Sequence, residues 1–145
     1  LTWDEQGRLW TTEHGRSGVR SGFDELNLIE SGKNYGWPVI QGDETDEDMV
    51  PPELHSGSDT TWAPASAEYQ NGSIFFGGLR GSAVYEAVIG DDIVLEKHFE
   101  DRFGRIRDVK AHGGYLYFTT SNRDGRGRPD ETDDRLLRVS LDYFS

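Results

Sequence analysis

The chain has 145 residues, a formal net charge of −12 and no cysteine. Its acidity argues against nucleic acid and anionic membrane surfaces as partners, since both require a basic face, and the lack of cysteine excludes disulfides and thiolate sites. No apolar run approaches the roughly 18 residues of a membrane span, and 18 glycines with only 34% hydrophobic residues favour strands and turns over helices.

Three similar segments recur along the chain. Residues 7–12, 72–77 and 114–119 each begin with a turn glycine and continue with residues that favour a strand. They start 65 and 42 residues apart, and about 40 residues is the length of one four-stranded blade of a β-propeller. The sequence therefore predicts propeller blades, with an insertion in the longer interval.

Further strand candidates follow these segments, and helical periodicity is nearly absent. They are residues 25–30, 83–89, 93–99 and 135–141. We expect an all-β chain that forms about two and a half propeller blades. Such a piece leaves sheet edges unpaired, so we expect it to need the remaining blades of the same polypeptide, or a second copy, to cover them.

The longer interval contains a polar stretch with an acidic run and several turn residues. We interpret it as a long surface loop whose acidic side chains are solvated, and the alternative is a metal site. The predicted organisation is a first partial blade over residues 1–38, an insertion loop over 39–61, a second blade over 62–103 and a last blade over 104–145.

Basic residues gather where the predicted strands end or begin. Residues 14–16 follow the first repeated segment and Arg80 follows the second, while Arg105 and Arg107 share one face of a further strand because side chains alternate with period two. Neighbouring guanidiniums repel unless an anion lies between them, and each offers a planar fork of donors to a carboxylate. Two interpretations stay open: ion pairs with acidic residues of the chain, and an anionic ligand at the mouth of the propeller channel.

Three stretches carry a resemblance to a known family. They are residues 22–38, with DELNLI followed by NYGWP, residues 76–81, with FGGLRG, and residues 103–125, with FGRIRDV and GYLYFTTSNRDG. From Leu1 to about Leu141 the chain resembles the C-terminal part of the soluble glucose/sorbosone (aldose sugar) dehydrogenases, quinoproteins that use pyrroloquinoline quinone (PQQ). The resemblance implies a six-bladed β-propeller and a periplasmic or extracellular location.

The resemblance implies that Arg80, Arg105 and Arg107 bind the quinone. The family has a basic residue that reaches the cofactor at the position of Arg80, a lysine in some members, and the two arginines of its Arg-x-Arg-Asp motif bind carboxylates and carbonyls. PQQ is a tricarboxylate, so this implied ligand agrees with the demand of the arginines for an anion.

Calcium is also implied by the resemblance. In the family the carbonyls of a Gly-Pro pair hold the calcium that polarises the quinone, and the matching residues are Gly15 and Arg16, without the proline. Backbone oxygens do not depend on the side chain, so calcium stays compatible. A second family calcium is held by a Glu side chain and the carbonyl of a Tyr ten residues later, matched by Glu25 and Tyr35. The alternative is that Glu25 is a salt-bridge partner and Tyr35 a turn residue.

The catalytic base is expected to lie outside this chain, which carries one candidate residue for contact with the sugar. Trp62 resembles an aromatic residue near the family's sugar pocket, and the alternative is a core tryptophan between blades. The family's catalytic histidine lies in an early blade, so we expect no catalytic base here. The parent protein is expected to oxidise an aldose at its anomeric carbon to the lactone, and this piece alone to be inactive.

Two other functions stay open. A hydrolytic propeller of the lactonase type would need acidic metal ligands in its channel in place of arginines. A binding or scaffold propeller would need neither metal nor quinone. Titration with the quinone, with and without calcium, separates these three possibilities.

Overall fold

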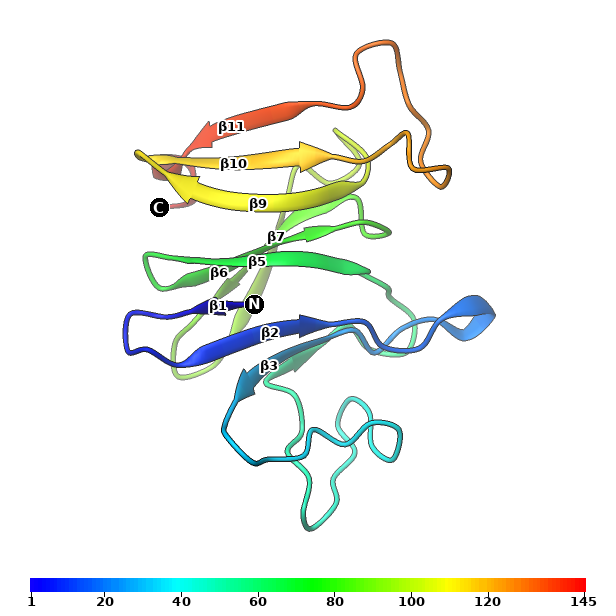
Figure 1. Ribbon diagram of the computed structural model, residues 1–145, viewed down its shortest axis with the longest axis vertical. Helices are drawn as coiled ribbons and strands as arrows, with labels where there is room; N and C mark the ends of the chain where they lie inside the picture. The colour runs from blue at the N-terminus through cyan, green and yellow to red at the C-terminus, as the bar shows by residue number, and fades with distance from the viewer.

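The computed structural model describes residues 1–145 and contains three antiparallel sheets. Figure 1 shows the sheets following one another along the long axis of the molecule in chain order. The helical elements are two short 3-10 helices, Gly18–Arg20 (η1) and Leu141–Phe144 (η2). Neither has the length and apolar character needed to cross a membrane.

The first sheet has four strands in chain order. They are Thr2–Trp3 (β1), Leu9–Glu13 (β2), Glu25–Ile29 (β3) and Leu54–His55 (β4). The register of β2 against β3 pairs Leu9 with Ile29 and Glu13 with Glu25. The first repeated segment therefore supplies the second strand of this sheet.

Strand β4 corrects the prediction of an insertion loop over residues 39–61. Leu54 and His55 pair with Leu26 and Glu25, so part of this stretch completes the first sheet. A strand of two residues is too short to show an alternating pattern, and it forms because β3 offers it an edge.

The other two sheets hold the remaining strands. The second is formed by Pro64–Gln70 (β5), Ser73–Gly78 (β6), Ala83–Val88 (β7) and Val94–His98 (β8), and the third by Ile106–His112 (β9), Tyr115–Thr120 (β10) and Leu136–Ser140 (β11). The repeated segments thus become β2, β6 and β10, the second strand of each sheet. This confirms a partial β-propeller, with two four-stranded blades and a three-stranded one.

The second blade is packed between the other two. Successive residues of a strand face opposite sides of the sheet, so Ile74 packs with Trp10 of the first blade while Phe75 packs with Leu116 of the third. All six residues of β6 are buried. Each buried side chain of this size contributes about 1.5–3 kcal/mol, so these two interfaces hold the blades together.

Strand β5 is linked directly to both neighbouring blades. A register shift interrupts its pairing with β6 between Ala65 and Glu68, and Ser66 within it has a positive φ of 59°. The Ser66 carbonyl accepts from the Thr12 hydroxyl at 3.2 Å, and the Ser66 hydroxyl accepts from the Val109 amide at 3.1 Å. A bulge of this kind re-aims side chains, and here it links β5 to β2 of the first blade and to β9 of the third.

Candidate functional site

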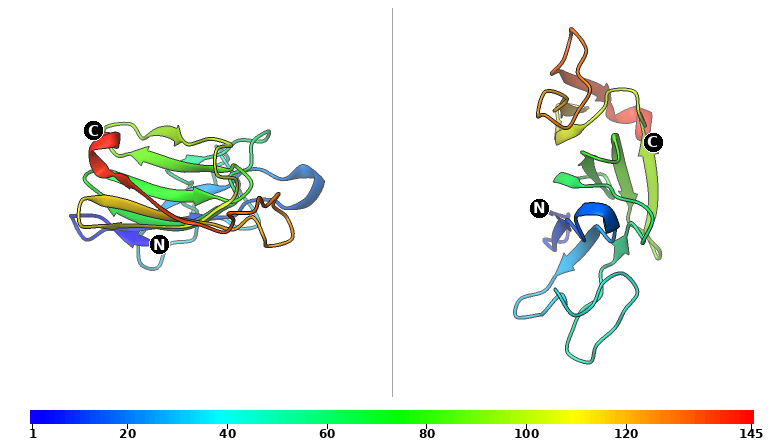
Figure 2. Two further views of the ribbon diagram at one scale, coloured as in Figure 1. Left: turned by 90° about the horizontal axis from the view of Figure 1, so that it is seen from above. Right: turned by 90° about the vertical axis from the view of Figure 1, so that its right-hand side faces the viewer.

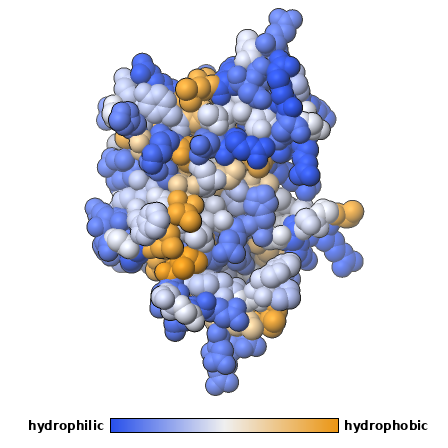
Figure 3. Space-filling model, viewed as in Figure 1, coloured by the Kyte–Doolittle hydropathy of each residue, from blue (hydrophilic) through white to orange (hydrophobic).

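The loops that follow β2 and β6, and the one that precedes β9, lie at the same end of the sheets, which we call the mouth (right-hand side of Figure 1). The view from above in Figure 2 shows the same loops projecting beyond the sheets at one end. Figure 3 shows this end as mainly hydrophilic, apart from a hydrophobic tip where η1 projects. The mouth is therefore the surface on which polar side chains of all three blades meet.

Arg105 and Arg107 share one carboxylate of the chain. Both donate to Oδ2 of Asp124, from Nε of Arg105 at 2.8 Å and from Nη2 of Arg107 at 3.1 Å. The Leu79 carbonyl accepts from Arg105 at 3.1 Å, and the Ser121 hydroxyl accepts from Arg107 at 3.0 Å. An ion pair within the chain, one of the two interpretations of the sequence, is therefore present. Sequence reasoning did not single out Asp124, which follows β10 in a turn.

The carboxylate of Asp124 is held in its ionised form. The backbone N–H of Arg126 donates to it, and the guanidinium of Arg105 adds a hydrogen bond and a positive charge. These contacts outweigh the opposing effect of burial and lower the pKa of Asp124 to about 2. One carboxylate balances only one of the two guanidiniums, so Arg105, Arg107 and Asp124 together keep a net positive charge.

Arg80 and Arg105 line one hollow of about 390 Å³ at the mouth, which we call the central hollow. The Nη1 of Arg80 donates to the Ser21 hydroxyl at 2.7 Å, and no carboxylate of the chain forms an ion pair with it. Arg126, which sequence reasoning missed, lines the same hollow. The surroundings are therefore positively charged although the chain as a whole is acidic.

Arg107 does not line the central hollow. It is 48% exposed, whereas the side chain of Arg105 is 13% exposed. The structure thus brings Arg80 and Arg105 to one hollow and connects Arg107 to them through Asp124. Binding of a cofactor by these three arginines stays a prediction.

Buried Asp24 ties two mouth loops together. Its Oδ1 accepts from the Gly15 amide at 2.9 Å, and its Oδ2 accepts from the amides of Trp62 and Ala63 at 2.6 and 2.9 Å. Its side chain therefore holds the loop after β2 against the segment before β5. Asp24 belongs to the DELN stretch of the sequence, but sequence reasoning assigned it no role.

Gly15 occupies a position that admits no side chain. A Cβ atom there would lie 2.2 Å from the carbonyl oxygens of both Gly22 and Phe23. Arg16 continues the loop, with its amide bonded to the Gly22 carbonyl at 2.9 Å. Its guanidinium lies over the Phe23 ring, 4.7 Å from the centroid, and its Nε is buried without a hydrogen-bond partner. The loop backbone is thus fixed on one side by Asp24 and on the other by residues 22–23.

All four residues expected to hold calcium line a second hollow, of about 210 Å³, which we call the lower hollow. These residues are Gly15, Arg16, Glu25 and Tyr35. Glu13 lines it as well, directly opposite Glu25 in the pairing of β2 with β3. Two facing carboxylates repel each other unless a proton or a cation lies near them, so this donor set suits calcium.

Burial of Glu25 raises the pKa of its carboxyl group, and the negative charge of Glu13 adds to this effect. The Asn27 side-chain amide opposes it by donating to Glu13 and Glu25 at 3.2 Å each. The Asn27 carbonyl oxygen is buried and accepts no hydrogen bond. The Asn27 side-chain amide thus bridges the two facing carboxylates.

Tyr35 fixes the loop after β3. Its hydroxyl donates to the Leu28 carbonyl at 2.6 Å and accepts from the Glu30 amide at 2.7 Å. The hydroxyl is therefore committed to the backbone, and the carbonyl is the group of Tyr35 that remains for a cation. Metal binding at this hollow stays a prediction.

Trp62 lies in the core, and this corrects the expectation that it stacks on a sugar. It is 2% exposed and packs against Phe76 and Tyr85, with ring centroids 5.4 and 5.8 Å away. Neither face of the indole is open to a pyranose. The alternative that the sequence left open, a core tryptophan, is the one that the structure shows.

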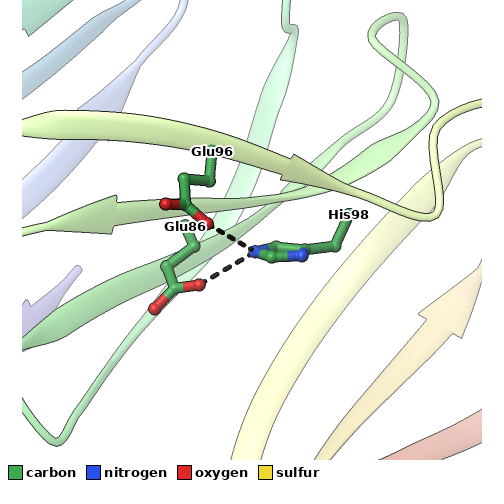
Figure 4. A group of neighbouring side chains, drawn as sticks. All are labelled: Glu86, Glu96 and His98. Atoms are coloured by element: carbon green, nitrogen blue, oxygen red, sulfur yellow. Dashed lines mark hydrogen bonds and ion pairs between the residues drawn. The ribbon is translucent and has the colours of Figure 1, made fainter. Parts of the chain in front are cut away.

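Three of the four histidines, His14, His55 and His98, form polar contacts within the chain. His14 is bonded to the Pro64 carbonyl at 2.8 Å. Figure 4 shows His98 facing two carboxylates on β7 and β8, with its Nε2 2.8 Å from Glu86 and 3.9 Å from Glu96. The imidazole thus lies between two facing acids of the outer strands.

Comparison with known proteins assigns the chain to a family. The sequence profile of the Glucose / Sorbosone dehydrogenase family matches residues 1–138. Aldose sugar dehydrogenase YliI of Escherichia coli K12 is 31% identical in an alignment covering 91% of this chain and 38% of that protein. The chain therefore spans about two fifths of the length of this curated relative.

Solved structures share the fold of this chain. The PQQ-bound aldose sugar dehydrogenase of Streptomyces coelicolor has a TM-score of 0.86 and 33% identity, over 97% of this chain and 42% of that one. The soluble aldose sugar dehydrogenase of Escherichia coli in its apo-form has a TM-score of 0.73 and 30% identity, over 93% of this chain and 42% of that one. The match over nearly the whole chain, in sequence and in structure, shows that this chain belongs to the glucose/sorbosone dehydrogenase family.

Proposed function

We propose that the chain is part of a quinoprotein that uses PQQ and calcium to oxidise an aldose at its anomeric carbon to the lactone. The observation that carries the proposal is the central hollow, where Arg80, Arg105 and Arg126 meet in a chain of net charge −12. An anionic ligand is the group that such a hollow favours. The PQQ-bound state of the Streptomyces coelicolor relative supports PQQ as that ligand.

The residues present fit a tricarboxylate. Arg80 has no carboxylate partner in the chain, and Arg105 shares Asp124 with Arg107. Arg105 is held by Leu79 and Asp124, so its guanidinium is oriented before any ligand arrives. Preorganised donors of this kind stabilise charge that develops on a bound oxygen.

Calcium fits the lower hollow. Gly15 and Arg16 would supply backbone carbonyls to the calcium beside the quinone, and Glu25, with Glu13 and the Tyr35 carbonyl, would hold the second calcium. Asp24 would keep the Gly15 carbonyl in place through its hydrogen bond to the amide of the same residue. Arg16 can remain beside such a cation because its guanidinium lies over the Phe23 ring.

When bound, the quinone would supply hydride acceptance, and calcium would polarise it. The residues of this chain would bind, orient and neutralise the cofactor. Removal of the sugar hydroxyl proton would fall to a base on other blades of the polypeptide, and such a base contributes about 10²–10⁴-fold. Leu1 and Trp3 are 63% and 59% exposed, which supports packing of further blades on this part of the chain.

The test is a titration of the full-length protein with PQQ, with and without calcium, followed by dye-linked oxidation of aldoses. We expect calcium-dependent quinone binding, which Arg105→Gln weakens, and turnover of aldoses. Arg138→Gln is the matched control, because this arginine lies on β11 over Tyr115. Quinone-independent hydrolysis of lactones would support the lactonase-type alternative, and absence of both activities would support a binding propeller.

A further inference from the structure

A third hollow at the mouth has an unusual charge. We call it the outer hollow; it measures about 420 Å³ and lies between the β6–β7 turn, the segment before β9 and the loop after β10. Its charged lining residues are six arginines and three aspartates: Arg80, Arg102, Arg105, Arg126, Arg128, Arg135, Asp101, Asp130 and Asp133. The lining therefore carries a formal charge of +3 in a chain of net charge −12.

Most of these guanidiniums have no acidic partner. Arg135 is paired with Asp130 and Asp133, at 2.9 and 3.5 Å. By contrast, Arg126 and Arg128 form no ion pair within the chain. The chain has 27 acidic residues for 15 basic ones, so unpaired arginines around one hollow are not explained by a shortage of carboxylates.

The size of the outer hollow suits one small molecule. Small-molecule sites measure roughly 300–1,000 Å³. Arg102 stacks on Phe103, with its guanidinium 5.1 Å from the ring centroid, so it is held at the wall. Planar forks of donors around such a space recognise anions.

The outer hollow adjoins the proposed cofactor site. Leu79, Arg80, Arg105 and Arg126 line both it and the central hollow. A molecule bound there would therefore lie next to the quinone site. No histidine lines the outer hollow, and two of its three aspartates are paired with Arg135. The lining therefore offers little to accept a proton, which suits a ligand that exchanges no proton with the protein.

We propose that the outer hollow binds a small anionic electron acceptor, an inference that rests on the proposed function. Oxidation of one aldose to its lactone releases two electrons and two protons. Two equivalents of a one-electron acceptor such as ferricyanide would take up the electrons and become ferrocyanide, and the protons would go to solvent. The positive lining attracts such an anion and repels a cationic acceptor.

The binding test uses ferrocyanide and the full-length protein without quinone or sugar. Isothermal titration calorimetry should show binding that weakens with added salt and falls about tenfold in R102Q/R128Q, two arginines that line the outer hollow and not the central one, since each exposed ion pair contributes a few-fold. Both side chains are exposed and make no hydrogen bond within the chain, and Arg102 only stacks on Phe103, so the variant should fold. R138Q is the control and should bind normally. Equal binding by R102Q/R128Q and the unchanged protein would overturn the proposal.

The kinetic test compares ferricyanide with the cationic acceptor phenazine methosulfate in the quinone-loaded protein. In R102Q/R128Q the ratio of the KM for ferricyanide to the KM for phenazine methosulfate should rise about tenfold. Turnover with both acceptors and an unchanged ratio would overturn the acceptor site alone. If no aldose reduces either acceptor, the proposed function fails and the acceptor role fails with it.

Discussion

Replacement of Asp24 by Asn tests whether this one carboxylate holds the mouth together. The two side chains have the same shape, but the amide offers one acceptor oxygen where the carboxylate offers two. Oδ1 accepts one backbone N–H and Oδ2 accepts two, all at 2.6–2.9 Å. The amide keeps more hydrogen bonds when its oxygen takes the place of Oδ2 and accepts from Trp62 and Ala63. Its NH2 group then takes the place of Oδ1, so the Gly15 N–H faces another donor.

The magnitude follows from these three bonds. A buried donor left unpaired costs about 1–3 kcal/mol, and each remaining bond loses about 1 kcal/mol when its acceptor is no longer charged. We expect Asp24→Asn to lower the free energy of unfolding by about 3 kcal/mol. Asp24→Ala, which removes all three bonds, should lower it further.

The assay is urea denaturation of the full-length protein at pH 7, together with quinone titration. Asp91→Asn is the matched control, because Asp91 is exposed in the turn between β7 and β8 and makes no side-chain bond. Quinone affinity should fall with Asp24→Asn, since the loop carrying Gly15 lines the central hollow. A loss of stability no greater than that of Asp91→Asn would refute the reasoning.

Three further results are expected. Calcium should raise the melting temperature of the full-length protein, because a ligand bound only by the folded state stabilises it. Glu25→Gln should reduce this rise, and an equal rise in this variant would contradict the site at Glu25. Acid should destabilise the chain between about pH 4 and pH 2. Burial of Asp4 raises its pKa, but hydrogen bonds from Trp10 and Arg8 outweigh this effect and lower the pKa from 3.8 to about 2. The pKa of Asp124 is also lowered from 3.8 to about 2. This stabilisation is complete above the unfolded pKa and is lost as the pH falls through the folded one. Urea midpoints of Asp124→Asn should therefore fall less over this window, and parallel curves would exclude the contribution. Finally, the 145-residue chain alone should show no dye-linked aldose oxidation, and turnover comparable to that of the full-length protein would mean that the base lies within it.

Local sequence patterns were enough to predict the repeating sheets. A turn glycine followed by strand-forming residues identifies β2, β6 and β10, because glycine permits the turn and the alternation of side chains is a property of the strand itself. The same alternation placed Arg105 and Arg107 on one face, and both reach the same oxygen of Asp124. The strands and the shared face depend on residues close together in the chain, whereas the contact with Asp124 spans 17 to 19 residues.

The tertiary structure decided which residues meet across the blades. Trp62 is enclosed by Phe76 and Tyr85, and β4 exists because β3 presents an edge to it. Asp24 accepts from backbone amides nine and 38 or 39 residues away, and such amides occur at every residue except proline. No pattern in the sequence marks them, because a backbone donor is defined by where the folded chain leaves it unpaired and not by its residue type.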